Sequence, residues 1–85
     1  MSEKKWFVYL LRCGDGSLYC GSTDDVLRRL ETHRSGKGAK YTRGRSPLEL
    51  VYTEECTGCS AALKREHAIK KLSRRDKLLL AGISE

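Results

Sequence analysis

The chain has 85 residues, a formal net charge of +6 and a sequence pI near 9.4. This length predicts one small domain whose core supplies a net stability of only about 3–5 kcal/mol. The charge favours a polyanionic partner, nucleic acid before an anionic membrane surface. The six apolar residues after Lys5 are too few for a signal sequence or a membrane span. We therefore expect a cytoplasmic, non-membrane protein with reduced cysteines.

Hydrophobic patterning predicts a flexible N-terminus over residues 1–5 and a single domain over residues 6–82. The expected elements, in chain order, are two strands, a helix, a strand and two helices: 6–12, 17–21, 24–34, 48–54, 60–72 and 74–81. A glycine-rich basic loop with room for one helical turn precedes the third strand. This order predicts an α+β fold in which a small three-stranded antiparallel sheet is flanked by helices.

The first two strands carry Tyr9 and Tyr19, and an Asp-Gly pair between them predicts a hairpin. A two-residue turn would place the two phenols on opposite faces of the hairpin. A three-residue loop with Gly16 in the left-handed conformation would instead pair Tyr9 with Gly21 and align both phenols on one face. We favour the three-residue loop, although strand tyrosines can also be ordinary packing residues.

The next predicted helix carries Arg29 and His33 four positions apart, along one edge of its apolar stripe. An arginine there can donate to a phosphate oxygen, and a histidine can transfer a proton near neutral pH. The alternative is a solvated basic helix face with an ordinary hydrogen-bonded histidine. Next to two tyrosines, the pair favours phosphodiester chemistry.

Glu66 interrupts the apolar stripe of the helix predicted over residues 60–72, a stripe made of Ala62, Leu63, Ile69 and Leu72. A buried carboxylate is costly unless it is paired or binds a metal. A salt bridge to a nearby Lys or Arg is one explanation for Glu66. The other is a site for Mg²⁺ or Mn²⁺, because a single carboxylate with water in the remaining positions suits these cations.

The loop over residues 35–46 is basic, and no acidic residue occurs between Glu31 and Glu49. Its candidates for nucleic-acid contact are Lys37, Lys40, Tyr41, Arg43 and Arg45. Basic side chains can follow a sugar-phosphate backbone, and a tyrosine can stack on a base. A solvated run of charge is the alternative for this loop.

The four cysteines suggest a competing hypothesis of a zinc or redox site, because Cys56 and Cys59 form a C-x-x-C motif. A zinc site would also need Cys13 and Cys20. The three-residue hairpin loop would place these two on opposite faces, which disfavours a shared metal.

Phe7-Val8-Tyr9 and Tyr19-Cys20-Gly21 resemble the two signature elements of the GIY-YIG endonuclease superfamily. Arg29 and His33 fall at the places of the family's helix arginine and its following His/Tyr, and Glu66 falls at the place of its metal-binding glutamate. The resemblance extends over about residues 6–80.

The stretch Gly36–Gly44 resembles the most distinctive segment of the family's small single-domain group, which is related to excision-repair and structure-specific nuclease modules. The resemblance implies a GIY-YIG-like fold and hydrolysis of phosphodiester bonds with one divalent cation, Mg²⁺ or Mn²⁺. It implies a substrate of structured or damaged DNA, rather than RNA, in repair or recombination.

The resemblance also implies roles for single residues. Tyr19 would be the base or would orient the water, with Tyr9 supporting it and His33 sharing proton transfer. Arg29 would stabilise the charge of the transition state, and Glu66 would hold the cation.

Two residues of the second signature region, Gly21 and Ser22, would let the backbone approach the scissile strand. The sequence departs from the family pattern in Phe7-Val8, in Cys20 and in having no asparagine. It also shows no separate DNA-recognition domain. These departures leave a second hypothesis: a non-catalytic nucleic-acid-binding module that acts with a partner protein or as a homodimer.

Overall fold

The predicted order of strands and helices is confirmed in the computed structural model, which describes residues 5–83. The predicted flexible N-terminus lies outside the described residues except for Lys5. The elements are β1 (Trp6–Arg12), β2 (Leu18–Thr23), α1 (Val26–Arg34), the 3₁₀ turn η1 (Lys40–Thr42), β3 (Glu49–Cys56), α2 (Cys59–Lys70) and α3 (Arg74–Leu80). The strands form an antiparallel sheet in the order β2-β1-β3. The α+β fold is thus as expected.

The β1–β2 hairpin has the three-residue loop that the sequence favours. Gly16 is left-handed with φ of +85°, and the Cys13 N–H donates to the Ser17 carbonyl at 2.8 Å. Tyr9 consequently pairs with Gly21, as expected. Because side chains alternate along a strand, this register sends Tyr9 and its odd-numbered neighbours to one face of the sheet.

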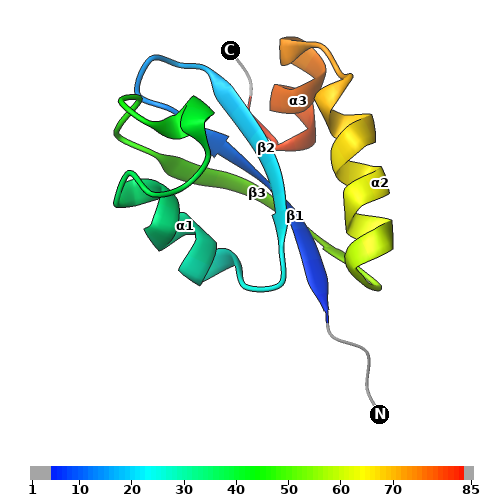
Figure 1. Cartoon of the computed structure of the whole chain (residues 1–85). Helices are drawn as coiled ribbons and strands as arrows, with labels where there is room; N and C mark the ends of the chain where they lie inside the picture. Colours follow the sequence, from blue (N-terminus) through cyan, green and yellow to red (C-terminus); the bar gives the residue numbers. More distant parts are fainter. Residues whose placement is uncertain (1–4, 84–85) are drawn as a thin grey trace.

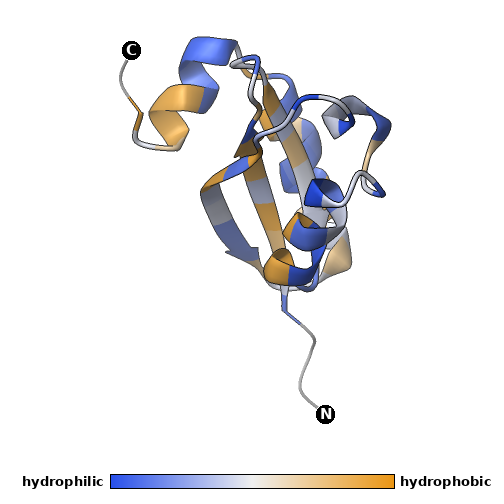
Figure 2. Ribbon diagram, turned by 90° about the vertical axis from the view of Figure 1, so that its left-hand side faces the viewer, coloured by the Kyte–Doolittle hydropathy of each residue, from blue (hydrophilic) through white to orange (hydrophobic). Residues whose placement is uncertain are grey.

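Helices cover both faces of the sheet, α1 on one side and α2 and α3 on the other (Figure 1). The core on the α2 side contains Val8, Leu10, Cys20, Ala62 and Ile69. The core on the α1 side contains Tyr9, Leu11 and Leu30. Apolar residues follow the central strand in Figure 2, consistent with its burial between two layers of helix.

Helix boundaries follow local capping chemistry. The Asp25 carboxylate accepts the Arg28 N–H at 3.1 Å at the start of α1, and the Ser73 hydroxyl caps α3 in the same way. Both residue types are favoured at this position, because a short side-chain oxygen can accept a backbone N–H that has no partner within the helix. One expectation for α2 is wrong: Leu63 is 54% exposed and lies outside the buried stripe.

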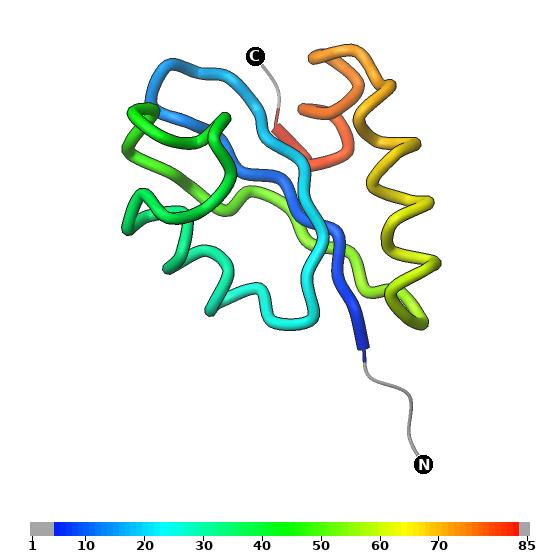
Figure 3. Tube along the Cα trace, viewed as in Figure 1, coloured from blue at the N-terminus to red at the C-terminus, as the bar shows by residue number. Residues whose placement is uncertain are grey.

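The basic loop is anchored to the β1–β2 turn, and Figure 3 shows the two segments side by side. The Gly14 N–H donates to the Arg45 carbonyl at 2.6 Å, and the Arg45 guanidinium forms an ion pair with Asp15. Hydrogen bonds from Ser17, aided by Arg45, lower the pKa of Asp15 to about 2, so this ion pair persists over a wide pH range. Of the helices in residues 5–83, none combines the length and apolar character that crossing a membrane requires.

Candidate active site

Tyr9 and Tyr19 lie together on the α1 face of the sheet, with ring centroids 6.3 Å apart. Gly21 makes this arrangement possible because Tyr9 lies across its bare backbone. A Cβ at Gly21 would lie 2.5 Å from the Tyr9 Oη and 3.1 Å from the Tyr19 ring. The glycine thus leaves the space that the Tyr9 phenol occupies.

His33 is buried between Tyr9 and the basic loop, and both of its ring nitrogens have partners. Its Nε2 lies 2.8 Å from the Tyr9 Oη and its Nδ1 lies 3.0 Å from the Thr42 Oγ1. Because the Thr42 hydroxyl donates its own proton to the Ala39 carbonyl at 2.8 Å, it can only accept from His33. His33 therefore carries its proton on Nδ1, and Tyr9 donates to Nε2.

Burial keeps the phenol of Tyr9 and the imidazole of His33 uncharged. Burial raises the pKa of Tyr9 to about 12, against the lowering effect of Arg29. Burial, assisted by the positive charge of Arg29, lowers the pKa of His33. At neutral pH Tyr9 is therefore a protonated phenol and His33 a neutral imidazole. Arg29 extends from this network to an open depression of about 270 Å³ that it lines with Arg28 and Thr32.

Thr42 is the member of this network that sequence reasoning missed. It is 2% exposed although it belongs to a loop of charged residues and glycines. Its only signal in the sequence is a short, uncharged side chain between Tyr41 and Arg43. That signal does not distinguish a buried threonine from a solvated one.

Glu66 lies on α2, on the other side of the edge strand β2. Its Oε1 accepts the Ser22 hydroxyl at 2.6 Å, and its Oε2 lies 2.6 Å from the Lys70 Nζ. The hydrogen bond to Glu66 raises the pKa of Lys70, with a smaller contribution from Tyr19. Glu66 contributes in turn to the raised pKa of Tyr9, after burial and Tyr19. The charged groups on the α2 face of β2 and the tyrosines on the α1 face are thus close enough to shift one another's pKa values.

This donor set fits a hydrated divalent cation rather than an enclosed one. Within residues 5–83 no three His, Cys, Asp or Glu side chains lie close enough together to hold a metal. Glu66 keeps 17% of its side chain exposed, and Lys70, its ionic partner, is 50% exposed. A partly exposed carboxylate whose partner is a half-exposed ammonium has room for a cation such as Mg²⁺ or Mn²⁺ with water ligands.

The predicted nucleic-acid contacts of the basic loop are exposed except for Arg45, which is partly buried. The exposed positions are Lys37, Lys40, Tyr41 and Arg43. The Arg45 guanidinium carbon lies 4.4 Å from the centroid of the Tyr41 ring. Tyr41 in turn lies 5.8 Å from Tyr19, centroid to centroid. The loop therefore continues the tyrosine cluster as a basic, aromatic surface.

The cysteines do not form the zinc site considered from sequence. All four lie within the described residues and are free thiols. Cys20 packs in the core facing α2, and the hairpin register directs Cys13 to the other face.

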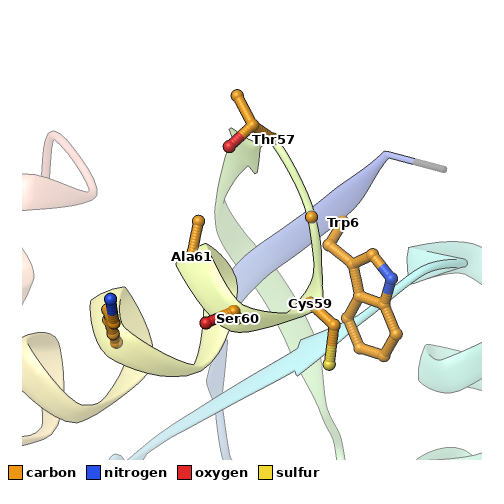
Figure 4. A pocket seen from close by; sticks show the side chains of 7 residues that line it. Trp6, Thr57, Cys59, Ser60 and Ala61 are labelled. Carbon is orange, nitrogen blue, oxygen red and sulfur yellow. The ribbon is translucent and has the colours of Figure 1, made fainter. Parts of the chain in front are cut away.

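A larger pocket, about 630 Å³, lies at the start of α2, where Trp6 of β1 also lines it. Figure 4 shows the Trp6 indole beside Cys59, with Ser60 on the first turn of the helix. This pocket shares no lining residue with the network of Tyr9, Arg29 and His33. We therefore assign the candidate site to the network and not to the larger cavity.

The family comparison agrees with this geometry. The GIY-YIG catalytic domain matches residues 5–79, which include both tyrosines, Arg29 and Glu66. The chain belongs to the GIY-YIG family. Membership implies a nuclease-like fold and a nucleic-acid substrate, and nucleases of this family typically use a divalent cation.

Small single-domain proteins are prominent among the relatives. A UPF0213 protein of Natronomonas pharaonis is 56% identical over 71 residues, 84% of each chain. A UPF0213 protein of Vibrio cholerae is 53% identical over 81 residues, 93% of this chain and 80% of its own. The solution NMR structure of the UPF0213 protein BH0048 from Bacillus halodurans has 50% identity and a TM-score of 0.58, covering 92% of this chain and 83% of that one.

Proposed function

We propose that the protein is a metal-dependent endonuclease that hydrolyses phosphodiester bonds in DNA, with structured or damaged DNA in repair or recombination as its substrate. One observation carries the proposal. Tyr9, Tyr19 and Arg29 meet on one face of β2, and Glu66 reaches the same strand from the other face. A phenol that orients or deprotonates water, a guanidinium that stabilises charge and a carboxylate that holds a metal can together serve phosphodiester hydrolysis.

Each side chain has a role that its environment supports. Tyr9 stays protonated, so it donates a hydrogen bond and does not act as the base. Tyr19, the partner ring, orients the attacking water or takes its proton. Arg29 stabilises negative charge on the phosphoryl oxygens. His33, 2% exposed, acts through Tyr9 by accepting its proton in a hydrogen bond.

The cation of the proposed reaction is Mg²⁺ or Mn²⁺, held by Glu66. When bound, it supplies positive charge beside the scissile phosphate and lowers the pKa of a water molecule. Ser22 donates to one carboxylate oxygen of Glu66 and so orients the carboxylate. For cation binding Lys70 must release the other oxygen, which its exposed side chain allows.

The basic loop supplies the contacts to the nucleic acid. Lys37, Lys40 and Arg43 are exposed cations for phosphates, and Tyr41 with Arg45 forms a surface for a base. Gly21 and Ser22 are neighbours on β2: Gly21 faces the tyrosines, and Ser22 contacts Glu66. In this proposal the scissile strand passes over these two residues. The proposal favours DNA over RNA and a cytoplasmic location, where the free thiols stay reduced.

Cleavage of single-stranded, duplex and branched DNA, with Mg²⁺ or Mn²⁺, tests the proposal. We expect Glu66→Gln to abolish cleavage and Arg29→Ala to reduce it by about 10²–10³-fold. Arg75→Ala is the matched control, since Arg75 is an exposed arginine of α3 that does not line the depression at Arg29. Absence of cleavage by the wild type on all these substrates with both metals contradicts the enzyme hypothesis.

The Lys70–Glu66 contact favours a second candidate, a nucleic-acid-binding module without catalysis that acts with a partner protein or as a homodimer. In this candidate Lys70 neutralises Glu66 permanently and no cation binds. It predicts salt-dependent DNA binding that Glu66→Gln leaves unchanged, together with no cleavage. Cleavage by the wild type, lost in Glu66→Gln, excludes this candidate.

A further inference from the structure

A small pocket lies where the β1–β2 turn, η1 and the start of α3 meet, at the same end of the molecule in Figure 1. Its volume is about 230 Å³, and its lining residues are Ser17, Leu18, Tyr41, Arg74 and Lys77. This volume is below the ~300–1,000 Å³ of pockets for drug-sized ligands, so the pocket suits a ligand no larger than a single nucleotide. Arg74 and Lys77 have no role in the site described above.

The segments that line this pocket, the basic loop and the start of α3, are both hydrogen-bonded to the β1–β2 turn. The Arg74 Nη1 donates to the Gly16 carbonyl at 2.5 Å, which ties α3 to the hairpin. The Gly14 N–H donates to the Arg45 carbonyl at 2.6 Å, which ties the basic loop to the same hairpin. The pocket is therefore formed before any ligand binds, which reduces the ordering cost of binding.

The lining combines two kinds of chemistry. Tyr41 and Leu18 offer an aromatic ring and an apolar side chain to a flat base, while Arg74 and Lys77 offer positive charge to a phosphate. Figure 2 shows this polar first half of α3 in blue, distinct from its apolar end. The nearby Asp15 is paired with Arg45 and does not line the pocket.

The pocket is also close to the candidate site, because the Tyr41 ring lies 5.8 Å from the Tyr19 ring. A strand whose phosphate lies at Tyr19 could therefore place a neighbouring nucleotide in the pocket. A base in a continuous duplex is stacked and paired, so it would have to leave its stack to enter.

We propose that this pocket binds one unpaired nucleotide next to the scissile phosphate, with its base against Tyr41 and its phosphate at Arg74 and Lys77. The proposal rests on the proposed function for the position of the scissile phosphate. It narrows the substrate to DNA with an unpaired nucleotide, such as a single strand, a flap or a junction.

The test measures metal-free binding by fluorescence anisotropy, with a labelled single-stranded DNA oligonucleotide and the blunt duplex of the same sequence. We expect the double variant Arg74→Ala/Lys77→Ala to bind the single strand at least about tenfold more weakly. In a plot of the logarithm of its binding constant against the logarithm of the salt concentration, the slope of the double variant should be smaller in magnitude by about one. Arg75→Ala is the matched control, because this exposed arginine of α3 does not line the pocket.

Two further variants keep the test independent of folding. Lys77→Ala leaves the Arg74–Gly16 bond intact and should weaken single-strand binding alone, with unchanged circular dichroism. Tyr41→Leu should abolish the additional quenching of a 2-aminopurine base that protein binding causes, since this increment needs a protein ring stacked on the base. Additional quenching that persists on binding of Tyr41→Leu overturns the assignment of the base to this ring.

The outcomes separate this proposal from the proposed function. Equal single-strand binding by the double variant and Arg75→Ala overturns the pocket, even where cleavage is retained. Equal losses on the single strand and the blunt duplex also overturn it, since they indicate contacts to paired phosphates. Weakened single-strand binding in a protein that cleaves nothing supports the pocket and contradicts the nuclease.

Discussion

The Nδ1 atom of His33 lies 3.0 Å from the Oγ1 atom of Thr42, and this hydrogen bond joins the buried tyrosine–histidine pair to the basic loop. The same imidazole accepts the Tyr9 hydroxyl through Nε2 at 2.8 Å. The basic loop and a candidate catalytic phenol are thus both hydrogen-bonded to the same imidazole ring. A substitution at Thr42 can therefore change the position of the Tyr9 phenol through His33, although Thr42 does not contact the substrate.

Thr42→Val should leave the Nδ1–H of His33 without an acceptor. We expect the free energy of unfolding to fall by about 1–3 kcal/mol, because a buried donor loses its partner. The tautomer of His33 should become mixed in ¹⁵N NMR spectra, with the exposed His67 as an internal reference. Thr42→Ser, which keeps the hydroxyl, should retain the Nδ1–H form. Wild-type stability and tautomer in Thr42→Val contradict the assignment.

Tyr9→Phe should remove the hydrogen bond to His33 while keeping the ring in place. We expect cleavage to fall by about 10²-fold, because Tyr9 and His33 lose the hydrogen bond that holds both side chains in position. The matched control is Tyr52→Phe, whose hydroxyl donates to Glu54 on β3 and not to the tyrosine network. Cleavage rates that are equal in the two variants would remove Tyr9 from the mechanism.

Gly21→Ala should displace the Tyr9 phenol, because the added Cβ would lie 2.5 Å from its oxygen. We expect a loss of about 1–3 kcal/mol of stability from overpacking. Gly58→Ala is the control, since its backbone is extended and a Cβ there meets nothing within 4 Å. Urea denaturation measures both variants, and equal stabilities would show that Tyr9 moves aside freely.

Lys70→Met should improve cation binding at Glu66, because the ammonium competes for Oε2. Because Lys70 is half exposed to solvent, the ion pair contributes no more than about 1 kcal/mol, so we expect Mn²⁺ affinity to rise by at most about fivefold. Electron paramagnetic resonance of Mn²⁺ measures the affinity directly, without cleavage. Glu66→Gln should abolish Mn²⁺ binding, and Glu31→Gln, on the exposed side of α1, should not. Weaker Mn²⁺ binding in Lys70→Met would show that the lysine assists the cation.

Stability should fall in mild acid because of His33, whose pKa is lowered in the folded state. Below about pH 6.5 the unfolded chain binds a proton on this residue that the folded protein does not. The free energy of unfolding should therefore decrease as the pH falls through 6.5 towards the folded pKa. Urea titrations at several pH values measure this slope. His33→Gln should lose the slope, and His67→Gln should keep it.

Several parts of the structure could be predicted from sequence because they depend on local chemistry. The alternation of residues and the position of Gly16 predicted that Tyr9 would pair with Gly21. The helices predicted over residues 24–34 and 74–81 correspond to α1 and α3, which begin after the capping residues Asp25 and Ser73. Each signal involves residues within one turn or one hairpin, where geometry follows from the backbone alone.

The features that sequence did not reveal depend on tertiary packing. Thr42 is buried only because the loop folds back onto His33. Leu63 is exposed because α2 contacts the sheet through Ala62 and Ile69. For Glu66 the sequence left a choice between a salt bridge and a cation, and the structure supplies Lys70 as the salt-bridge partner.

The position of β2 at the edge of the sheet restricts how copies of this chain can associate. An edge strand can pair with a strand of another molecule and extend the sheet. Pairing through β2 would cover the backbone around Gly21, which lies between the Tyr19 and Glu66 side chains. A dimer formed in this way would block its own candidate sites. A homodimer that joins two sheets edge to edge therefore leaves both sites open only when it uses β3.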